Sequence, residues 1–325
     1  MYREDLLPKA KVGDKLMTLK EAVKKFVNDG DVLTPCGTAQ MTPMALTMEI
    51  IRQRKRGLTV ATTGNLDNVD ILVGAGCVDK LELAYVATHY GRRGARPAPC
   101  LRRAVEHGVP RKVVIEDYSN LTMTLRFLAG ALRLPFIPTR SLKGSDLASK
   151  ATWRGDKKLA LVKSPFTEEE VVVVPPCNPD VAIVHCQLAD REGNAQRWGA
   201  LASDGWAVKA SKKIIVSAEK IVDSDVIRKN PNLTFIPGFM VDAVVEAPFG
   251  AHWWACQGFY DYDPEFQAMY VEMASKQETF EKFLEEWVFG VEDHQGYLKK
   301  LGEERLERLR VKEHVYSSPV DYGFR

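Results

Sequence analysis

The chain has 325 residues, of which 45% are hydrophobic and 27% charged, with a formal net charge of +2; this is typical of a soluble globular protein of two domains, or of one large α/β domain with an appendage. The balance does not suggest a nucleic-acid partner, and no apolar run is long enough to span a membrane. The N-terminal segment lacks the apolar stretch of a signal peptide, and six scattered cysteines without a CxxC pair argue against a zinc site or a disulfide framework, so we expect free thiols in a reducing cytoplasm.

The first half of the chain alternates strands with helices. Thr18 and Glu21 form a capping-box pattern that predicts a helix, and a short strand at 32–33 runs into a turn of small residues at 35–38. A helix then begins at Pro43. Further strands are predicted at 58–61, 81–86 and 113–115, and further helices at 68–74, 100–106 and 119–132. This alternation predicts a mostly parallel, doubly wound α/β sheet flanked by helices.

The second half contains an irregular excursion, more strands and then helices alone. Residues 143–167 are polar and rich in glycine and lysine, so we expect a loop-like excursion there. Unbroken apolar runs predict strands buried on both faces at 171–174, 181–185, 214–216 and 241–245. After Pro264 the apolar spacing is helical to the end, and the sequence predicts an α/β domain at 1–263 followed by a helical C-terminal arm at 264–325.

The first candidate site is the turn that contains Gly37 and Thr38. A turn of small residues between a strand and a helix can offer backbone N–H groups to an anion. The turn matches neither the GxGxxG fingerprint nor a Walker loop, because no Gly-Lys-Ser/Thr follows. A plain strand-to-helix turn explains the same residues.

The second candidate is the loop 88–96, which follows a predicted strand. It holds His89, Tyr90, Arg92, Arg93 and Arg96. Guanidinium groups at the carboxyl end of a strand can clamp a carboxylate or the phosphates of a nucleotide-like ligand. A solvated basic loop is the alternative interpretation.

The third candidate follows the strand at 241–245. The strand breaks at Pro248 and opens into a turn that contains Phe249, Gly250 and His252 among large aromatic rings. Such a turn can border a pocket at the carboxyl edge of an α/β sheet, and it can equally be an aromatic plug of the core. His185 ends a buried strand, but no nucleophile elbow and no metal-ligand spacing accompanies it, so the sequence predicts neither a hydrolase triad nor a metal site.

Many segments in order resemble the A subunit of the glutaconate type of family I coenzyme A-transferases. The likeness covers nearly the whole chain, as many separate matches in order. The matching segments are 31–37, 43–52, 116–119, 134–136, 143–145, 180–198, 241–245, 247–248, 250–252 and 280–289. The resemblance implies the α/β fold of that family.

The resemblance also implies a reaction. In the family, a glutamate of the B subunit attacks an acyl-CoA thioester and forms a mixed anhydride. The anhydride is converted to a glutamyl-CoA thioester, and a second acid then reverses these steps. This chain is then expected to carry no catalytic residue and to bind no metal or redox cofactor, with the CoA thioester as a substrate. Together with a B subunit it would form a hetero-oligomer, in which it contributes one wall: Gly37–Thr38, the 88–96 loop and the 249–252 turn. The arginines would bind the distal carboxylate of a dicarboxylic acid or the CoA phosphates.

Two departures from the family pattern keep other functions open. The first turn reads Cys36-Gly37-Thr38 where the family has Gly-Gly-Phe, and the 88–96 loop is basic, so we expect a bulkier or more strongly anionic acid than glutaconate. Ring-opening hydrolases and decarboxylases share the scaffold, and in a hydrolase Glu116 would serve as the acid; the position that aligns with the hydrolase acid is Asn120, which weighs against this. A non-catalytic acyl-CoA-binding subunit is the remaining alternative.

Overall fold

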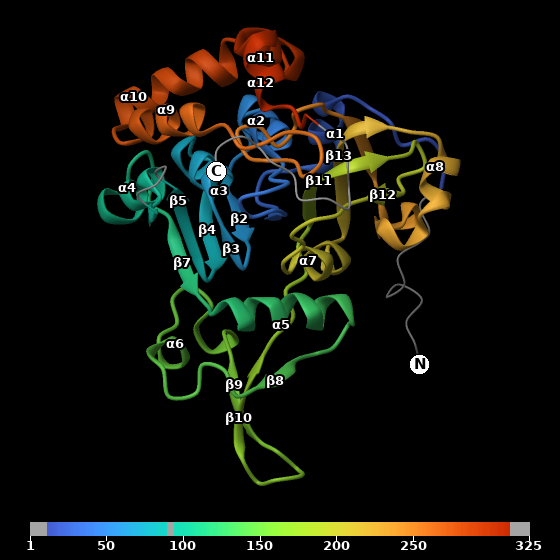
Figure 1. Cartoon of the computed structure of the whole chain (residues 1–325). Helices are drawn as coiled ribbons and strands as arrows, with labels where there is room; N and C mark the ends of the chain where they lie inside the picture. The colour runs from blue at the N-terminus through green and yellow to red at the C-terminus, as the bar shows by residue number, and fades with distance from the viewer. Residues whose placement is uncertain (1–11, 90–93, 313–325) are drawn as a thin grey trace.

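The computed structural model describes residues 12–89 and 94–312, and its main element is a nine-stranded sheet (Figure 1). Seven of the strands run parallel to their neighbours. In spatial order they are β15 (Ala243–Glu246), β13 (Lys213–Ile221), β11 (Val181–Ala189), β1 (Val32–Pro35), β2 (Leu58–Ala61), β4 (Val78–Leu83) and β7 (Val114–Asp117). The predicted α/β class with a mostly parallel sheet is confirmed.

The order of the strands places a switch point between β1 and β11. From β1 the chain adds β2, β4 and β7 on one side, and it then returns to add β11, β13 and β15 on the other. Leu33 of β1 lies opposite Val60 on one side and Val181 on the other. Ligands of open α/β sheets bind outside the carboxyl ends of the strands beside such a switch, so the end of β1 is the place to look for a site.

Two apolar cores cover the two faces of the sheet. Along β11, Val181 and Ile183 point into the first core, and Ala182 and Val184 point into the second, as the two-residue period of a strand requires. Short α6 (Asp146–Ser149) and α8 (Ser224–Lys229) lie apart from these cores. The helices whose residues fill the cores are α1 (Leu19–Phe26), α2 (Met44–Arg52), α3 (Asp67–Gly74), α4 (Pro99–His107), α9 (Pro264–Ala274), α10 (Gln277–Leu284) and α11 (His294–Leu301) on the first face, and α5 (Asn120–Ala131) and α7 (Asp204–Ala210) on the second.

The C-terminal helices α9 to α12 (Glu303–Leu309) lie together on one side of the molecule (Figure 1). Their aromatic rings pack against the buried indole of Trp253, which stacks on Phe266 and Tyr270 at centroid distances of 5.3 and 5.0 Å. These helices therefore share the first core with α2 and α3. The division of the chain at residue 263 stays a prediction.

Short strands form two further sheets and an extension of the main one. β12 (Ala195–Gln196) and β14 (Thr234–Ile236) continue the main sheet in antiparallel pairing beside the end of β11. A second sheet joins β3 (Gly64–Asn65), β5 (Tyr85–His89) and β6 (Ala95–Pro97). The third is antiparallel and joins β8 (Ile137–Thr139), β10 (Glu170–Val174) and β9 (Ala160–Lys163).

The strand predicted at 81–86 is divided between two sheets. β4 ends at Leu83, and the Ala84 amide then donates to the Thr63 carbonyl at 2.9 Å, which leads the chain into β5 beside β3. The apolar pattern continues across the break, so periodicity alone concealed it. As a result the predicted 88–96 loop belongs to a β5–β6 hairpin rather than to a direct exit from the main sheet.

The strand predicted at 171–174, expected to be buried on both faces, is formed but lies outside the main sheet. β10 instead pairs with β8 and β9 in a projection, residues 137–174, that we call the β arm; it extends from the body in Figure 1. Val172, Val173 and Val174 are buried although the β arm is small, because α5 packs against it. A valine run reports burial and not the sheet to which a strand belongs. The predicted excursion 143–167 lies within the β arm, where it includes α6 and β9 as well as loops.

Two expectations about environment can be compared with the described residues. None of their helices is both long and apolar enough to cross a membrane. All six cysteines are free and buried. Burial raises the pKa of Cys36 well above the ordinary thiol range and the pKa of Cys186 to about 12, so these thiols stay protonated at neutral pH.

Candidate functional site

A hollow of about 320 Å³ opens at the carboxyl edge of the sheet, close to the end of β1. We call it the edge pocket. It lies where the turn after β1, the β2–β3 turn, β5, α5 and α7 meet. The residues that line it are Thr38, Thr63, Gly64, Tyr85, Asn120, Thr124, Ala202, Ser203 and Trp206. The structure thus brings the predicted turn of Gly37 and Thr38 to the pocket together with segments that sequence reasoning had not connected to it.

The turn after β1 depends on glycine at position 37. Gly37 has φ +103°, and a Cβ atom there would lie 2.5 Å from the Met41 carbonyl oxygen, so a side chain would have no room. The turn places the Thr38 hydroxyl where it donates to the Gly64 carbonyl at 2.9 Å. This bond joins the end of β1 to the start of β3 and fixes one wall of the edge pocket.

The opposite wall is the start of α7. The Ser203 and Thr63 hydroxyls are 2.8 Å apart, and the next residue, Asp204, accepts the backbone N–H of Gly37. Asp204 also pairs with the fully buried Arg197, with Nη2 and Oδ2 2.8 Å apart. Burial raises the pKa of Asp204, and Arg197 opposes that rise. The pair holds α7 and the glycine turn in one position relative to each other.

The lining of the edge pocket is neutral and rich in hydrogen-bonding groups. It presents threonine and serine hydroxyls and one carboxamide, with the partly exposed rings of Tyr85 and Trp206 at its sides. Among the described residues that line it, none carries a carboxylate, an imidazole, an ammonium or a guanidinium. Such a lining can donate hydrogen bonds to an anionic ligand, but it contains no strong nucleophile and no general base.

Glu116, the predicted acid of a hydrolase, lies elsewhere and is fully occupied. Its carboxylate accepts the Thr152 amide at 3.0 Å and the Arg154 amide at 3.1 Å, and it lies 3.2 Å from the Lys158 ammonium. Burial opposes ionisation, but these donors hold the pKa of Glu116 below its usual value. The side chain is fully buried and ties the β arm to β7. Asn120, and not Glu116, reaches the edge pocket.

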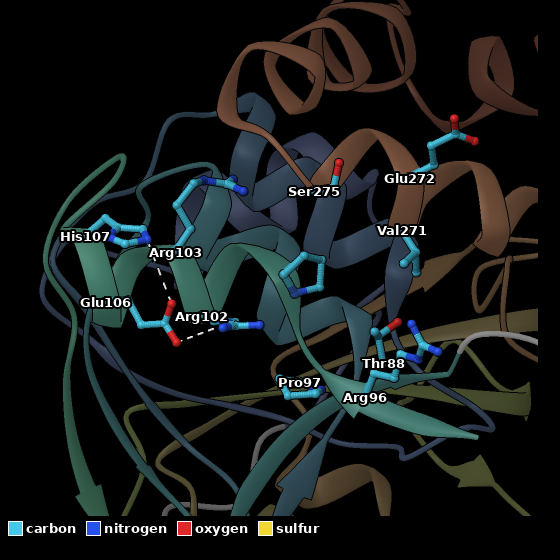
Figure 2. A pocket seen from close by; sticks show the side chains of 11 residues that line it. Thr88, Arg96, Pro97, Arg102, Arg103, Glu106, His107, Val271, Glu272 and Ser275 are labelled. Carbon is cyan, nitrogen blue, oxygen red and sulfur yellow. Dashed lines mark hydrogen bonds and ion pairs between the residues drawn. The ribbon is translucent and has the colours of Figure 1, made fainter. Parts of the chain in front are cut away.

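The basic loop is only partly described. Tyr90, Arg92 and Arg93 lie outside the described residues, and His89 ends β5. Arg96 is exposed and lines a different hollow of about 650 Å³ between β6, α4 and α9 (Figure 2). In that hollow Arg102 forms an ion pair with Glu106 at 2.8 Å. The structure therefore does not bring Arg96 together with Thr38.

The turn at 249–252 is buried and bound to its own surroundings. The Phe249 and Gly250 amides donate to the Glu219 carboxylate at 2.8 and 3.2 Å, and the Tyr260 hydroxyl donates to it at 2.6 Å. Phe249 has φ +55°, a backbone conformation that these bonds help to hold. A direct contact of Phe249 or Gly250 with substrate stays a prediction.

His252 belongs to the same buried region. Its Nδ1 is 2.6 Å from the Tyr297 hydroxyl and its Nε2 is 3.0 Å from Asp263, which also accepts two hydrogen bonds from Arg305. Burial lowers the pKa of His252, and Asp263 opposes that change. The imidazole joins the turn after β15 to α11 and to Asp263 at the start of α9, and Asp263 in turn binds Arg305 of α12. A contact with substrate stays a prediction for His252 as well.

A serine, a histidine and a glutamate come together where sequence reasoning found no triad. His185 on β11 lies directly opposite Ser217 on β13, and Glu219 follows two residues later on the same face. His185 Nδ1 is 2.9 Å from the Ser217 hydroxyl, and Nε2 is 2.7 Å from Glu219. All three side chains are buried, and none of them lines the edge pocket. The polar residues Ser217 and Glu219 at alternate positions of an apolar run were the available signal.

Two of these three residues, His185 and Glu219, form with Cys256 the one group of potential metal ligands among the described residues. Ligand atoms of His185, Glu219 and Cys256 lie within 4.8 Å of one another. The Glu219 oxygens already accept hydrogen bonds from two amides and from Tyr260, and burial raises the pKa of Cys256 well above its usual value. This donor set is occupied by protein hydrogen bonds and does not fit a metal ion.

Comparison with known proteins gives the family. The sequence profile described as coenzyme A transferase matches residues 16–247, which include every parallel strand of the main sheet. The chain belongs to the coenzyme A transferase family. Within this CoA-transferase family the crystal structure of glutaconate coenzyme A-transferase from Acidaminococcus fermentans matches with a TM-score of 0.85 and 37% identity, over 91% of this chain and 96% of that chain.

Relatives in the CoA-transferase family are named as subunits of larger enzymes. The chain is 38% identical to the A subunit of glutaconate CoA-transferase from Acidaminococcus fermentans, over 91% of this chain and 95% of that protein. It is 36% identical to the A subunit of 3-oxoadipate CoA-transferase from Pseudomonas knackmussii, over 89% and 98%. It is 31% identical to the cholesterol ring-cleaving hydrolase IpdA subunit of Rhodococcus jostii, over 90% and 98%. The resemblance found in the sequence is confirmed.

Proposed function

We propose that this chain is the A subunit of a heteromeric CoA-transferase and that the edge pocket is its wall of the acid-binding site. The neutral lining of the pocket carries this proposal: it offers hydrogen-bond donors to a carboxylate but no group able to attack a thioester. The nucleophile therefore comes from another chain. The relatives named as A subunits support a B-type partner, and we place the complex in the cytoplasm.

The reaction follows from this division of labour. A glutamate of the B-type partner attacks the acyl-CoA thioester, and CoA thiolate leaves as the mixed anhydride forms. The thiolate then attacks the glutamyl carbonyl, which releases the first acid and gives a glutamyl-CoA thioester, and a second acid reverses both steps. Throughout, the Asn120 carboxamide donates hydrogen bonds to the acid, because the Thr38 and Thr124 hydroxyls already donate to the carbonyls of Gly64 and Asn120. The rings of Tyr85 and Trp206 limit access of water. On this proposal the chain needs no metal and no redox cofactor.

The acid is proposed to be dicarboxylic. A hollow of about 320 Å³ is at the small end of ligand pockets, and a partner that covers its mouth would complete it. Two relatives, named for CoA transfer to glutaconate and to 3-oxoadipate, support this class. We assign the distal carboxylate or the CoA phosphates to Arg92 and Arg93 on the basic loop, since guanidinium forks recognise both groups.

A thioester hydrolase is the second candidate, because one relative is named as a ring-cleaving hydrolase subunit. A hydrolase of this type would need an acid of its own at the pocket, and the two positions considered from the sequence differ here. The Glu116 carboxylate is buried and occupied by the Thr152 amide, the Arg154 amide and the Lys158 ammonium. The residue that lines the pocket at this end of β7 is Asn120, which has a carboxamide and not a carboxylate. This arrangement favours transfer over hydrolysis. Decarboxylation and simple acyl-CoA binding have no residue of the described chain in their favour.

The test is a transfer assay on the complex purified with its B-type chain. Acetyl-CoA and succinyl-CoA serve as donors, and a panel of dicarboxylates that includes glutaconate and 3-oxoadipate serves as acceptors. We expect a new acyl-CoA to form at the rate at which the donor disappears, with no net release of free thiol. Free thiol that accumulates at the same rate with and without the acid would replace the transferase by a hydrolase. Absence of both reactions would leave only a binding role.

A further inference from the structure

The solvent face of α5 has an unusual composition for a surface helix. Leu121, Leu125, Leu128 and Leu132 recur at intervals of four, three and four residues, which places them on one side of the helix. Leu121 and Leu132 are 53% and 55% exposed, and the other two are partly exposed. We call these four residues the leucine face. Surface helices normally present charged or polar residues to water on this side.

The leucine face is not needed for the internal packing of α5. The opposite side of the helix carries Met123, Phe127 and Gly130, which are buried against the second core. A Cβ atom on Gly130 would lie 2.4 Å from the Cys177 carbonyl oxygen, so the helix is already in close contact there. Arg126 on that side forms a buried ion pair with Glu82 at 2.7 Å. The helix therefore has a complete inner contact and a second apolar side that faces outward.

The apolar surface continues beyond the helix, and from Leu121 to Leu132 it carries no exposed charge. Leu134 and Phe136, which lead from α5 into the β arm, are 37% and 50% exposed. Between Asn120 and Phe136 the only ionisable side chains are Arg126, which is buried, and Arg133. Single exposed apolar residues are ordinary, but a contiguous uncharged row marks an interaction surface.

The position of the leucine face identifies the chain that covers it. Asn120 and Thr124, in the first turns of α5, line the edge pocket, so the leucine face begins at the mouth of the pocket. The pocket lacks a nucleophile, and a chain that brings one must cover this mouth. A second copy of this chain would place two pockets of the same neutral lining against each other. The required occupant is a different chain, with an apolar surface beside a reactive carboxylate.

We infer that the leucine face of α5 is the docking surface for the B-type subunit, and that its contact with the partner aligns the partner's glutamate with the edge pocket. This inference rests on the proposed function, which supplies the need for a partner nucleophile. Leucines in the centre of a protein interface are removed from water, and uncharged cores with polar rims are typical of such contacts. The exposed Asp117 precedes the leucine face and the exposed Arg133 directly follows Leu132, where a rim is expected, with Leu134 and Phe136 beyond Arg133.

The test uses the L121E/L132E double variant in the full-length chain. Both side chains are more than half exposed and neither lines the edge pocket, so the change adds two charges to the surface without altering the inner contact of α5. The matched control is V105E/V226E, which changes two apolar residues that are 45% and 40% exposed on α4 and α8. The equilibrium constant Kd with the copurifying B-type chain is measured by biosensor, and the unfolding temperature of each variant is measured alone.

We expect the L121E/L132E variant to bind the B-type chain at least tenfold more weakly than wild type, with an unchanged unfolding temperature, while V105E/V226E binds as wild type. Turnover should return to the wild-type level when the B-type chain is raised above the new Kd. A Kd within twofold of wild type would overturn the inference, as would a change confined to self-association of this chain. Because binding is measured without turnover, the absence of CoA transfer would count against the proposed function and not against this docking surface.

Discussion

Two places at the carboxyl edge of the sheet look alike in sequence and differ in chemistry. The edge pocket follows the ends of β1 and β2, and the region around Glu219 joins β11 and β13 to the turn after β15, so both collect polar side chains from several segments. In the pocket the hydroxyls are at a hollow; around Glu219 every carboxylate oxygen already accepts hydrogen bonds from the protein. The difference teaches that the type of residue does not decide which group acts on a ligand. Access of a ligand to the group decides it, because the pocket hydroxyls also form hydrogen bonds within the protein.

The largest effect is expected from removal of the Glu219 carboxylate, which lies at the centre of the buried hydrogen-bond network. Glu219→Ala leaves the Phe249 and Gly250 amides, Tyr260 and His185 without their acceptor, and we expect it to lower the free energy of unfolding by about 3 to 5 kcal/mol. Urea unfolding of the chain measures this. The control is Glu246→Ala on the neighbouring β15, an exposed carboxylate whose removal changes stability by less than about 0.5 kcal/mol. Equal effects of the two substitutions would contradict the structural role of Glu219.

A second test uses pH. Burial raises the pKa of Asp67 to about 7, although Trp253, Thr88 and Gln267 donate hydrogen bonds to it. The folded chain then binds a proton between about pH 4 and pH 7 that the unfolded chain has released, so stability falls as the pH rises through that window. Asp67→Asn should remove about 2 to 4 kcal/mol of this pH dependence, measured as the difference from wild type in urea unfolding at pH 5 and pH 8.

The matched control for Asp67 is Asp79→Asn, because Asp79 is a partly exposed carboxylate near the start of β4. Its pH dependence should follow wild type. A wild-type chain whose stability relative to Asp67→Asn is the same at both pH values would show that Asp67 is ionised throughout the range.

Substitutions in the basic loop test whether its arginines bind the ligand. Arg92→Ala with Arg93→Ala should raise the KM for the acid, or for acyl-CoA, by about 10- to 100-fold while kcat of the complex stays near wild type, because binding shared by ground and transition states is lost. Arg102→Ala in the other hollow is the control and should change neither constant. If the double variant behaves as wild type, the assignment of this loop is wrong.

The smallest effect is expected from a substitution that adds a charge to the neutral lining of the edge pocket. Asn120→Asp adds a carboxylate to the lining, and we expect about a tenfold rise in the KM for the acid from like-charge repulsion. Asn120→Ala serves as the control that removes the hydrogen bond without adding charge. The unfolding temperature should not change for either. A gain of thioester hydrolysis in Asn120→Asp would reveal how close the scaffold is to a hydrolase, whereas an unchanged KM would place the acid elsewhere.

Local chemistry explains what the sequence predicts correctly. Alternating apolar runs predict the parallel strands and most helices, and the position of Gly37 predicts a turn that only glycine can form. The sheet to which a strand belongs depends on distant residues, so the sequence did not reveal that the 81–86 strand is divided or that β10 lies outside the main sheet. Ser203 and Trp206 were missed for the same reason: they reach the pocket from a segment far from Thr38 in sequence, through a tertiary contact of α7 with the turn.

The register in which two strands pair is the second property that the sequence did not reveal. His185 meets Ser217 because β11 and β13 pair directly at these positions, and no property of either strand alone fixes that pairing. The turn at 249–252 shows the converse, since its aromatic and imidazole groups suggested a binding surface while the interior contained enough donors and acceptors to occupy them. Sequence reasoning found the edge of the sheet, and tertiary contacts determined which of its polar groups remain available.

The central claim is that this chain supplies a binding wall and that the nucleophile belongs to its partner. The most direct test exposes the purified complex briefly to acyl-CoA, quenches it in acid and measures the intact mass of each chain. The account predicts a CoA-sized covalent adduct on the B-type chain, with this chain at its unmodified mass. An adduct on this chain, or disappearance of the thioester with neither chain ever modified, would contradict it.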